Sequence, residues 1–373
     1  MPSHSLHMSV LQFITSVPWD VRRGSGCYVG TRTLVQALRQ LGIEVVLVTP
    51  GFATPIYAAT RFLFNETLRW RHLSGDATVG IDADGYAVAG RPGKLPHIAC
   101  IKGVLGDAVP FERGLTKASL AFQARLEASH ARRADRVITV SRYCVGRLEE
   151  LYGVNNAVVV PELIDLRGWR QLFLANPAIP DPRKFTVLSV CRFYPRKRLD
   201  VLLNAVALLR DRIPELEVRI VGGGPEYQCL RQLSSKLSID QVVRWLGDVN
   251  LSNLAAEYNR SDLFCLPSAQ EGFGIVFLEA MAAGKPIVAA RAAAVPEVVR
   301  SGILVQPEDP EALADAIFLL YRDPDLRASL GLAGSREVEQ FEMHHVAARF
   351  VSEVAKIVPA VKIAEALEGE HAT

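Results

Sequence analysis

Residues 263–290 read LFCLPSAQEGFGIVFLEAMAAGKPIVAA, and this stretch decides the fold class. It begins with a short apolar run, Leu263–Pro267, which has the length of a strand buried on both faces. A loop with two glycines and an apolar segment of helical length follow, and Gly284 and Pro286 end that segment. Ile287–Ala290 is again a short apolar strand. Strand, loop, helix and strand in this order are typical of a parallel sheet with helical crossovers.

The same alternation extends over the whole chain. Two long helical patterns, Thr31–Leu41 and Thr116–Arg133, have apolar residues at intervals of three and four. The predicted strands of the first half are Val10–Ser16, Ile43–Thr49, His97–Ile101, Arg136–Ser141 and Ala157–Val160. Those of the second half are Phe185–Cys191, Leu216–Val221, Val242–Leu246, Leu263–Pro267, Ile287–Ala290 and Ile303–Val305. The sequence therefore predicts an α/β protein of two Rossmann-like domains that face each other across a cleft.

A proline-rich stretch, residues 161–184, interrupts this alternation and predicts a linker between the domains. We expect an N-terminal domain over residues 1–165 and a C-terminal domain over residues 166–345. Because ligands bind at the carboxyl ends of strands in such sheets, the loops that follow the strands are the places to search for a site.

Composition limits the classes of partner. The chain of 373 residues has 42 Lys and Arg against 40 Asp and Glu, a formal charge of +2. Such a balance provides no overall attraction for nucleic acid, so anions must be recognised locally. The six cysteines and eight histidines show no metal-ligand spacing, so no metal is expected. A basic leader and a run of about 18 apolar residues are both missing, which favours a cytoplasmic protein.

Three loops have the composition of anion-binding loops. Gly24–Gly30 lies between a predicted strand and a predicted helix, where backbone N–H groups can meet a phosphate. Its third glycine comes one residue too late for the dinucleotide fingerprint, which disfavours a dinucleotide oxidoreductase. Arg192–Arg198 has four cations after a strand, and Gly222–Gly224 follows the next strand. Each of the three loops could also be an ordinary turn.

Glu271 and Glu279 form the most informative pair. Glu271 precedes the predicted helix, and Glu279 is the single charge within an apolar helical segment, where burial without a partner is costly. Two carboxylates in these positions could accept hydrogen bonds from vicinal hydroxyl groups of a ligand. The free N–H groups at the helix start could meet its phosphate.

The segment E-G-F-G-I-V-F-L-E-A-M-A-A-G-K-P, residues 271–286, resembles the E-x7-E signature of the family 4 glycosyltransferases, which are retaining enzymes of the GT-B fold. The resemblance covers nearly the whole second domain, including Arg192 with Lys197 and the Val221–Glu226 loop. The first domain matches more loosely. The resemblance implies a donor-binding C-terminal domain, an acceptor-side N-terminal domain, and a C-terminal helix in residues 346–373 that crosses back to the N-terminal domain.

Carried onto this sequence, the resemblance implies a role for each matched residue. Arg192 and Lys197 would neutralise the donor diphosphate, Glu271 would contact the donor sugar, and these three are the candidate catalytic residues. Glu279 would accept from the nucleotide ribose. The remaining candidate donor-binding residues are Gly24, Ser25, Gly26, Gly223, Phe273, Gly274, Ile275 and Val276. The donor would be a nucleotide diphosphate sugar, UDP- or GDP-linked, used without a metal or other cofactor, and the acceptor a glycan, a lipid or a small molecule.

The first domain departs from the family pattern in one position. Lys102 stands where family members often have a histidine, and Asp107 follows shortly after it. We expect these two residues to make the acceptor or sugar contact, and His97 to be a histidine at the edge of a strand. Two alternatives stay open. One is a catalytically silent binding module, which this substitution makes plausible, and the other is a different GT-B activity, such as a nucleotide-sugar epimerase or a phosphorylase.

Arg61–Phe64 and Arg69–His72 combine aromatic residues with cations, as segments that lie on membrane surfaces do. A peripheral membrane contact at the inner face is one interpretation of these segments. A helix with an ordinary basic exposed face is the other.

Overall fold

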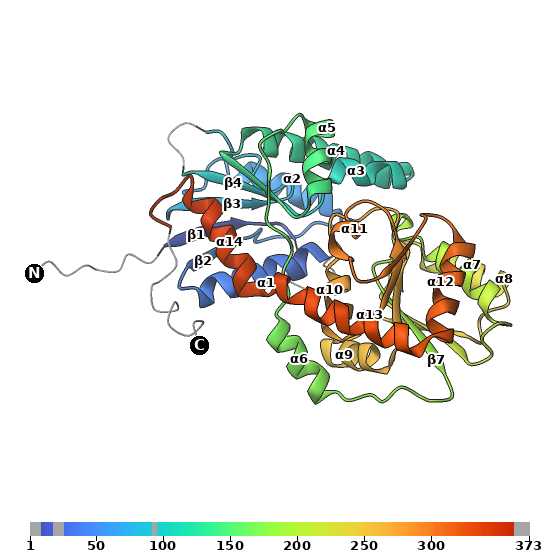
Figure 1. Cartoon of the computed structure of the whole chain (residues 1–373). Helices are drawn as coiled ribbons and strands as arrows, with labels where there is room; N and C mark the ends of the chain where they lie inside the picture. The colour runs from blue at the N-terminus through green and yellow to red at the C-terminus, as the bar shows by residue number, and fades with distance from the viewer. Residues whose placement is uncertain (1–8, 18–25, 92–94, 362–373) are drawn as a thin grey trace, which may run out of the picture. The chain divides into compact units, whose positions relative to one another are not determined.

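The computed structural model describes residues 9–17, 26–91 and 95–361, which form two compact units (Figure 1). The first unit contains the described residues up to Leu163 together with those from Met343 onward, and the second is Ile164–Glu342. Each unit has its own six-stranded sheet, and every strand pairing in both sheets is parallel.

The first unit has the strand order β2-β1-β3-β4-β5-β6. The strands are β1 (Val10–Ile14), β2 (Glu44–Val48), β3 (Ala77–Ile81), β4 (His97–Ile101), β5 (Arg136–Thr139) and β6 (Val158–Val159). Both β2 and β3 pair with β1, so the order in which strands are added to the sheet reverses at β1. The loops that follow β1 and β3 therefore flank the position where ligands bind in open α/β sheets.

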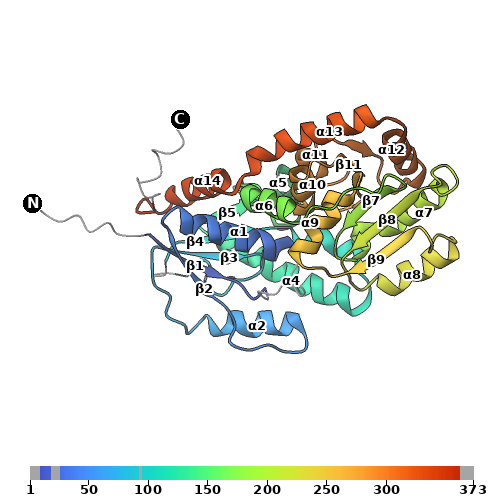
Figure 2. The same ribbon diagram turned by 90° about the horizontal axis from the view of Figure 1, so that it is seen from below.

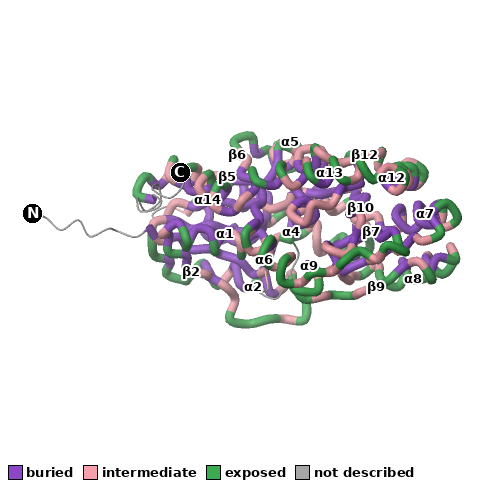
Figure 3. The backbone as a smooth tube through the Cα atoms, turned by 60° about the horizontal axis from the view of Figure 1, so that its bottom comes forward, coloured by how far each residue is buried: buried purple, intermediate pink, exposed green. Residues whose placement is uncertain are grey.

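The helices of the first unit are α1 (Gly26–Gln40), α2 (Tyr57–Thr67), α3 (Leu105–Ala108), α4 (Gly114–Arg133), α5 (Arg142–Tyr152) and α14 (Met343–Ala355), with one 3-10 turn at Val109–Phe111. Helices α1 and α14 pack together over one face of the sheet, where Leu38 and Phe350 join its core. Phe64 and Leu68 belong to a separate cluster at α2 that Leu126 of α4 also contacts. Figure 3 colours the backbone by burial, and buried positions recur along α1.

The second unit has the order β12-β11-β10-β7-β8-β9, which is the Rossmann order. Its strands are β7 (Phe185–Val190), β8 (Leu216–Val221), β9 (Val243–Gly247), β10 (Leu263–Leu266), β11 (Ile287–Ala290) and β12 (Ile303–Val305). Its helices are α6 (Leu166–Ala175), α7 (Leu199–Leu209), α8 (Tyr227–Lys236), α9 (Leu251–Arg260), α10 (Ile275–Ala282), α11 (Val295–Val298), α12 (Pro310–Arg322) and α13 (Pro324–Glu337), with 3-10 turns at Pro195–Lys197 and Val338–Phe341. Figure 2 shows the helices around this sheet.

The predicted α/β class is confirmed by these two parallel sheets. Strand β3 is absent from the prediction because Gly75 and Gly80 flank and interrupt its short apolar run. A Cβ at Gly80 would lie 2.2 Å from the Asp84 carbonyl oxygen, so packing requires this glycine. The proline-rich stretch is only partly irregular, since Leu166–Ala175 forms α6 and packs on α9.

Candidate functional site

The reversal of strand order in the second unit lies between β7 and β10. The loop after β7 carries the cationic run, and the loop after β10 carries Glu271. The two loops are joined by a hydrogen bond of 2.9 Å from Ala269 N to the Arg196 carbonyl oxygen. Two sequence features that are more than 70 residues apart therefore meet at one edge of the sheet, as the predicted site requires.

Lys197 and Glu271 form the central contact of this edge. Lys197 Nζ lies 2.5 Å from Glu271 Oε1, and the Ser268 hydroxyl donates to the same oxygen over 2.9 Å. The side chains of Lys197 and Glu271 are 12% and 7% exposed. Burial keeps such a pair from being screened by solvent, so the ammonium group and the carboxylate hold each other in fixed positions.

The four cations of the run do not form one cluster. Arg192 Nη1 contacts Asp248 Oδ1 at 3.0 Å, and both side chains are partly exposed. Arg198 instead pairs with Asp200 and with Glu308 on the far side of the loop. Arg198 is thus paired with carboxylates of the chain itself, and its left-handed backbone, with φ 50°, leads into α7.

The glycines of the loop after β8 have different roles. A Cβ at Gly222 would lie 2.0 Å from the Cys191 carbonyl oxygen, and one at Gly224 would lie 2.7 Å from Phe193 N. Both glycines thus let this loop pack against the loop after β7. A Cβ at Gly223 would meet nothing closer than Asp248 Oδ2 at 4.0 Å, and the Phe193 amide donates to the Gly223 carbonyl oxygen over 3.0 Å. Packing within the chain therefore does not explain Gly223, which is the glycine that the sequence assigns to the donor.

Gly274 begins α10 in a conformation that favours glycine. Its φ is 92°, and a Cβ there would lie 2.6 Å from the Phe277 ring. Phe273 packs its ring edge-on against Phe341, so only the Phe273 backbone is left for a ligand. Ile275 and Val276 are in the first turn of α10, where N–H groups have no partner within the helix. These amides can meet an anion, as the sequence predicts.

Glu279 is buried within α10, as its apolar surroundings indicate. It is 6% exposed, and the Tyr258 hydroxyl donates to its Oε2 over 2.9 Å. Burial raises the pKa of Glu279 to about 7, although the hydrogen bond from Tyr258 opposes the shift. Tyr258 is fully buried in α9, and sequence reasoning missed it. Its signal was weak, because an aromatic residue on an amphipathic helix is ordinarily part of the core.

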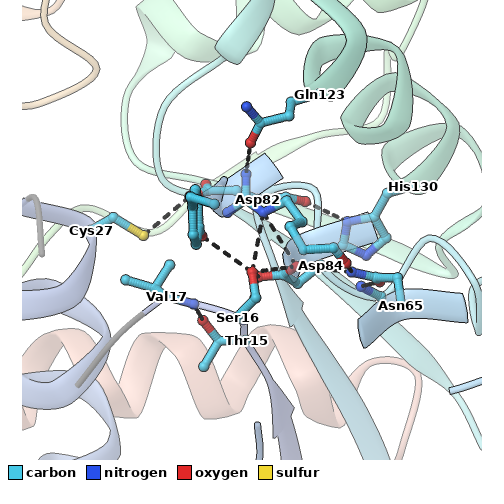
Figure 4. Close-up of polar contacts among 12 residues, drawn as sticks. Thr15, Ser16, Val17, Cys27, Asn65, Asp82, Asp84, Gln123 and His130 are labelled. Carbon is cyan, nitrogen blue, oxygen red and sulfur yellow. Dashed lines mark hydrogen bonds and ion pairs between the residues drawn. The ribbon is translucent and has the colours of Figure 1, made fainter. Parts of the chain in front are cut away.

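A second polar cluster lies at the carboxyl edge of the sheet in the first unit (Figure 4). Asp84 accepts from the Ser16 amide at 2.6 Å and contacts Arg61 Nε at 3.3 Å. Arg61 is only 4% exposed, so the expectation that it belongs to a surface patch is wrong. Asp82 accepts from the Lys102 amide at 2.8 Å and from Cys27 Sγ at 3.1 Å, and its left-handed φ of 51° is rare for an aspartate.

The two residues predicted to replace the family histidine are both engaged. Lys102 Nζ lies 2.9 Å from Glu162 Oε2, with side chains 5% and 4% exposed. A Cβ at Gly30 of α1 would lie 2.2 Å from that oxygen, so Gly30 makes room for the pair. Asp107 contacts Arg147 Nε at 2.8 Å. Sequence reasoning missed Glu162, although it stands beside a proline at the end of the sheet.

Two predictions remain, one for residues 24–26 and one for His97. Gly24 and Ser25 lie outside the described residues, and Gly26 is the exposed first residue of α1. His97 is the first residue of β4, as predicted, and it is buried. Its Nε2 lies 2.7 Å from Nε2 of His130, whose Nδ1 approaches the Asp82 carbonyl oxygen. Burial lowers the pKa of His97 well below its usual value and that of His130 to about 4, so both rings are neutral.

The described part of the chain has neither a cluster of metal ligands nor a membrane-spanning helix. No group of three or more His, Cys, Asp or Glu residues there is placed to hold a metal ion. No helix in residues 9–17, 26–91 and 95–361 is long and apolar enough to cross a membrane.

Part of the chain is similar to a known protein family. Residues 175–337 match the family of glycosyl transferases group 1. A GDP-mannose-dependent α-(1-6)-phosphatidylinositol monomannoside mannosyltransferase of Mycolicibacterium smegmatis is 32% identical over 225 residues, which are 54% of this chain and 56% of that protein. The chain thus spans about half the length of this curated relative.

Solved structures resemble the chain over most of its length. Sucrose-phosphate synthase from Thermosynechococcus elongatus has a TM-score of 0.78 with 21% identity, over 94% of this chain and 100% of that one. Anabaena HepE in complex with UDP and glucose has a TM-score of 0.68 with 20% identity, over the same shares. At these identities the likeness concerns the fold, and it confirms the predicted GT-B class.

Proposed function

We propose that this chain, whose residues 175–337 match the group 1 glycosyl transferase family, moves a sugar from a nucleotide diphosphate sugar to an acceptor. The transfer retains the anomeric configuration, needs no metal, and takes place in the cytoplasm. The acceptor is a glycan, a lipid or a small molecule. The names of the mannosyltransferase and of the HepE complex, with GDP-mannose and UDP, support a UDP- or GDP-linked donor.

The observation that carries this proposal is the contact between Lys197 and Glu271 at the strand-order reversal, inside the matched segment. A fixed ammonium group there can stabilise the negative charge that develops on a leaving diphosphate. Arg192, on the same loop, can add a planar guanidinium group once Asp248 releases it. Together with the first amides of α10, the two cations would supply the charge that a metal supplies in other enzymes.

Glu271 and Glu279 complete the donor site in this proposal. Glu271, held by Lys197 and Ser268, contacts the donor sugar, and Glu279 accepts from the nucleotide ribose. Gly223 leaves space for the donor to approach the backbone. In the first unit, Lys102 and Asp107 act on the acceptor side, and Glu162 holds the Lys102 ammonium group in place.

The test begins with thermal unfolding of the purified chain in the presence of UDP-, GDP- and ADP-sugars. A ligand that binds only the folded state raises the unfolding temperature. One donor class is expected to do so, and Arg192→Ala and Glu279→Ala are each expected to weaken that binding. Glu149→Ala is the matched control, because Glu149 is exposed on α5 in the other unit. Unchanged affinity in both site variants would overturn the donor-site assignment.

Release of the nucleoside diphosphate is then measured with and without an acceptor. Release that depends on the acceptor supports transfer. Conversion of the donor sugar without an acceptor would show an epimerase instead. If no donor binds, the alternative that stays is a catalytically silent binding module.

A further inference from the structure

The exposed aromatic residues of the described chain are concentrated on two helices of the first unit. Of the six aromatic side chains among its exposed large hydrophobic residues, five lie in or beside α2 and α4, and the sixth is Tyr227. These five are Phe52, Tyr57, Phe62, Trp70 and Phe122. Ile56, Leu63 and Leu115 add exposed aliphatic groups to them. We call these eight residues the α2–α4 surface.

Contacts between the helices make this surface continuous. The rings of Phe62 and Phe122 lie 6.0 Å apart. Beneath them, Arg61 Nη1 of α2 contacts Gln123 Oε1 of α4 at 3.0 Å. Figures 1 and 2 both show the two helices close to each other in the first unit. The apolar side chains of both helices therefore belong to one face.

The most exposed apolar groups lie on these helices and beside their ends. Leu63 is on α2, Ile56 immediately precedes that helix, and Trp70, which is 90% exposed, lies three residues after its end. Leu115 and Phe122 are seven residues, or two helical turns, apart on α4, and Leu115 is also 90% exposed. The core is already supplied by Phe64 and Leu68 on the inner side of α2. These outer side chains thus do not contribute to the core.

The charges around the α2–α4 surface are mostly positive. Arg71, Arg113, Lys117 and Arg125 are exposed, and none forms an ion pair with another described residue. Arg69 is paired with Glu66, which is half-buried and also accepts from the Tyr86 hydroxyl. Arg61 is turned inward to Asp84 and adds nothing to the outer charge. Aromatic and aliphatic groups surrounded by cations are complementary to a bilayer of anionic lipids.

We propose that the α2–α4 surface docks on an anionic lipid bilayer, with Trp70 and Leu115 inserted at the headgroup level and the four exposed cations over the lipid phosphates. This docking is independent of the donor site proposed above. It would bring the first unit to acceptors that are held in a membrane.

Co-sedimentation of the full chain with vesicles tests the proposal. Vesicles of phosphatidylcholine with phosphatidylglycerol are expected to bind the chain, and vesicles of phosphatidylcholine alone are expected to bind it far more weakly. The difference should decrease as salt is raised, because salt screens the attraction. Replacing Arg71 or Lys117 by Gln should weaken binding about fivefold for each cation removed. Trp70→Ser with Leu115→Ser should weaken it about tenfold or more.

A matched control comes from the second unit. Ile179 and Leu174 are 89% and 82% exposed, so Ile179→Ser with Leu174→Ser removes similar apolar area away from the α2–α4 surface and should leave vesicle binding unchanged. All these residues are exposed, so the thermal unfolding temperature and its increase with the donor should stay at wild-type values. This separates a failure of docking from a failure of the donor site.

Three results would overturn the proposal. The first is binding that does not distinguish anionic from zwitterionic vesicles, and the second is binding that survives Trp70→Ser with Leu115→Ser. The third is a concentration-dependent dimer that the same double variant abolishes, while vesicles bind neither the wild type nor the variant. That result would assign the surface to a second copy of this chain.

Discussion

Replacing Glu279 by Gln should stabilise the folded chain at neutral pH and above while weakening its binding of a nucleotide. Glu279 is buried in α10, and burial raises its pKa from 4.5 to about 7. At high pH the folded chain must therefore hold an ionised carboxylate in a position that disfavours charge. Gln has no charge to bury, and its amide oxygen can still accept from the Tyr258 hydroxyl.

The sign and size follow from this pKa. Between about pH 4.5 and 7 the folded state binds a proton at Glu279 that the unfolded state has lost, so the contribution of this group to stability falls as pH rises through that window. Above pH 7 the loss is complete. At about 1.4 kcal/mol for each pKa unit, it is on the order of 3 kcal/mol. Glu279→Gln should thus gain up to that amount at pH 8 and almost nothing at pH 4.5.

Urea unfolding at a series of pH values measures the difference between the variant and the wild type. Glu149→Gln, at an exposed position on α5, is the control for a change of net charge. A stability difference for Glu279→Gln that stays constant from pH 4.5 to 8 would refute the reasoning, because it would mean that Glu279 does not titrate differently in the folded state. Nucleotide affinity is measured on the same samples, since the proposed ribose contact predicts that it falls.

Substitutions at five further residues have expected outcomes that unfolding or binding measurements can check. Lys102→Met should cost about 3–5 kcal/mol of unfolding free energy because it leaves Glu162 buried without its partner. Adding Glu162→Met should restore much of this stability. A loss below about 1 kcal/mol in the single variant would contradict the expectation. Gly274→Ala should cost more than 1 kcal/mol because its φ is 92° and Phe277 is close, whereas Gly223→Ala should leave stability nearly unchanged and lower nucleotide affinity. Asp248→Asn should raise nucleotide affinity up to about fivefold by freeing Arg192 from a partly exposed ion pair; a decrease in calorimetric titration would show that Asp248 helps binding.

The sequence predicted the strands well wherever a strand is a continuous apolar run. Leu263–Pro267 and Ile287–Ala290 correspond to β10 and β11, because strands covered on both faces must be apolar throughout. It missed β3, where packing against the Asp84 carbonyl oxygen requires Gly80. A local pattern reports propensity, and at Gly80 a contact from another part of the chain outweighs it.

The candidate site shows the same division. Arg192, Lys197, Glu271 and Glu279 are part of the resemblance to the family 4 glycosyltransferases, and that resemblance predicts a nucleotide-sugar site at them. Their partners could not be predicted, because Tyr258 and Asp248 come from other elements and carry no local signal. Likewise, Arg61 looked like a surface cation in a basic aromatic segment, whereas the fold turns it inward to Asp84.

By itself, then, the sequence determined the α/β class, the loops that follow the strands and the residue types available there, because hydrophobic periodicity and glycine placement act over a few neighbouring residues. Only the tertiary structure decided which charges are paired and which are exposed. Pairing depends on side chains that are distant in sequence and close in space, as with Lys197 and Glu271 or Lys102 and Glu162. Burial then sets whether such a charge stabilises the fold, titrates near neutral pH or remains available to a ligand.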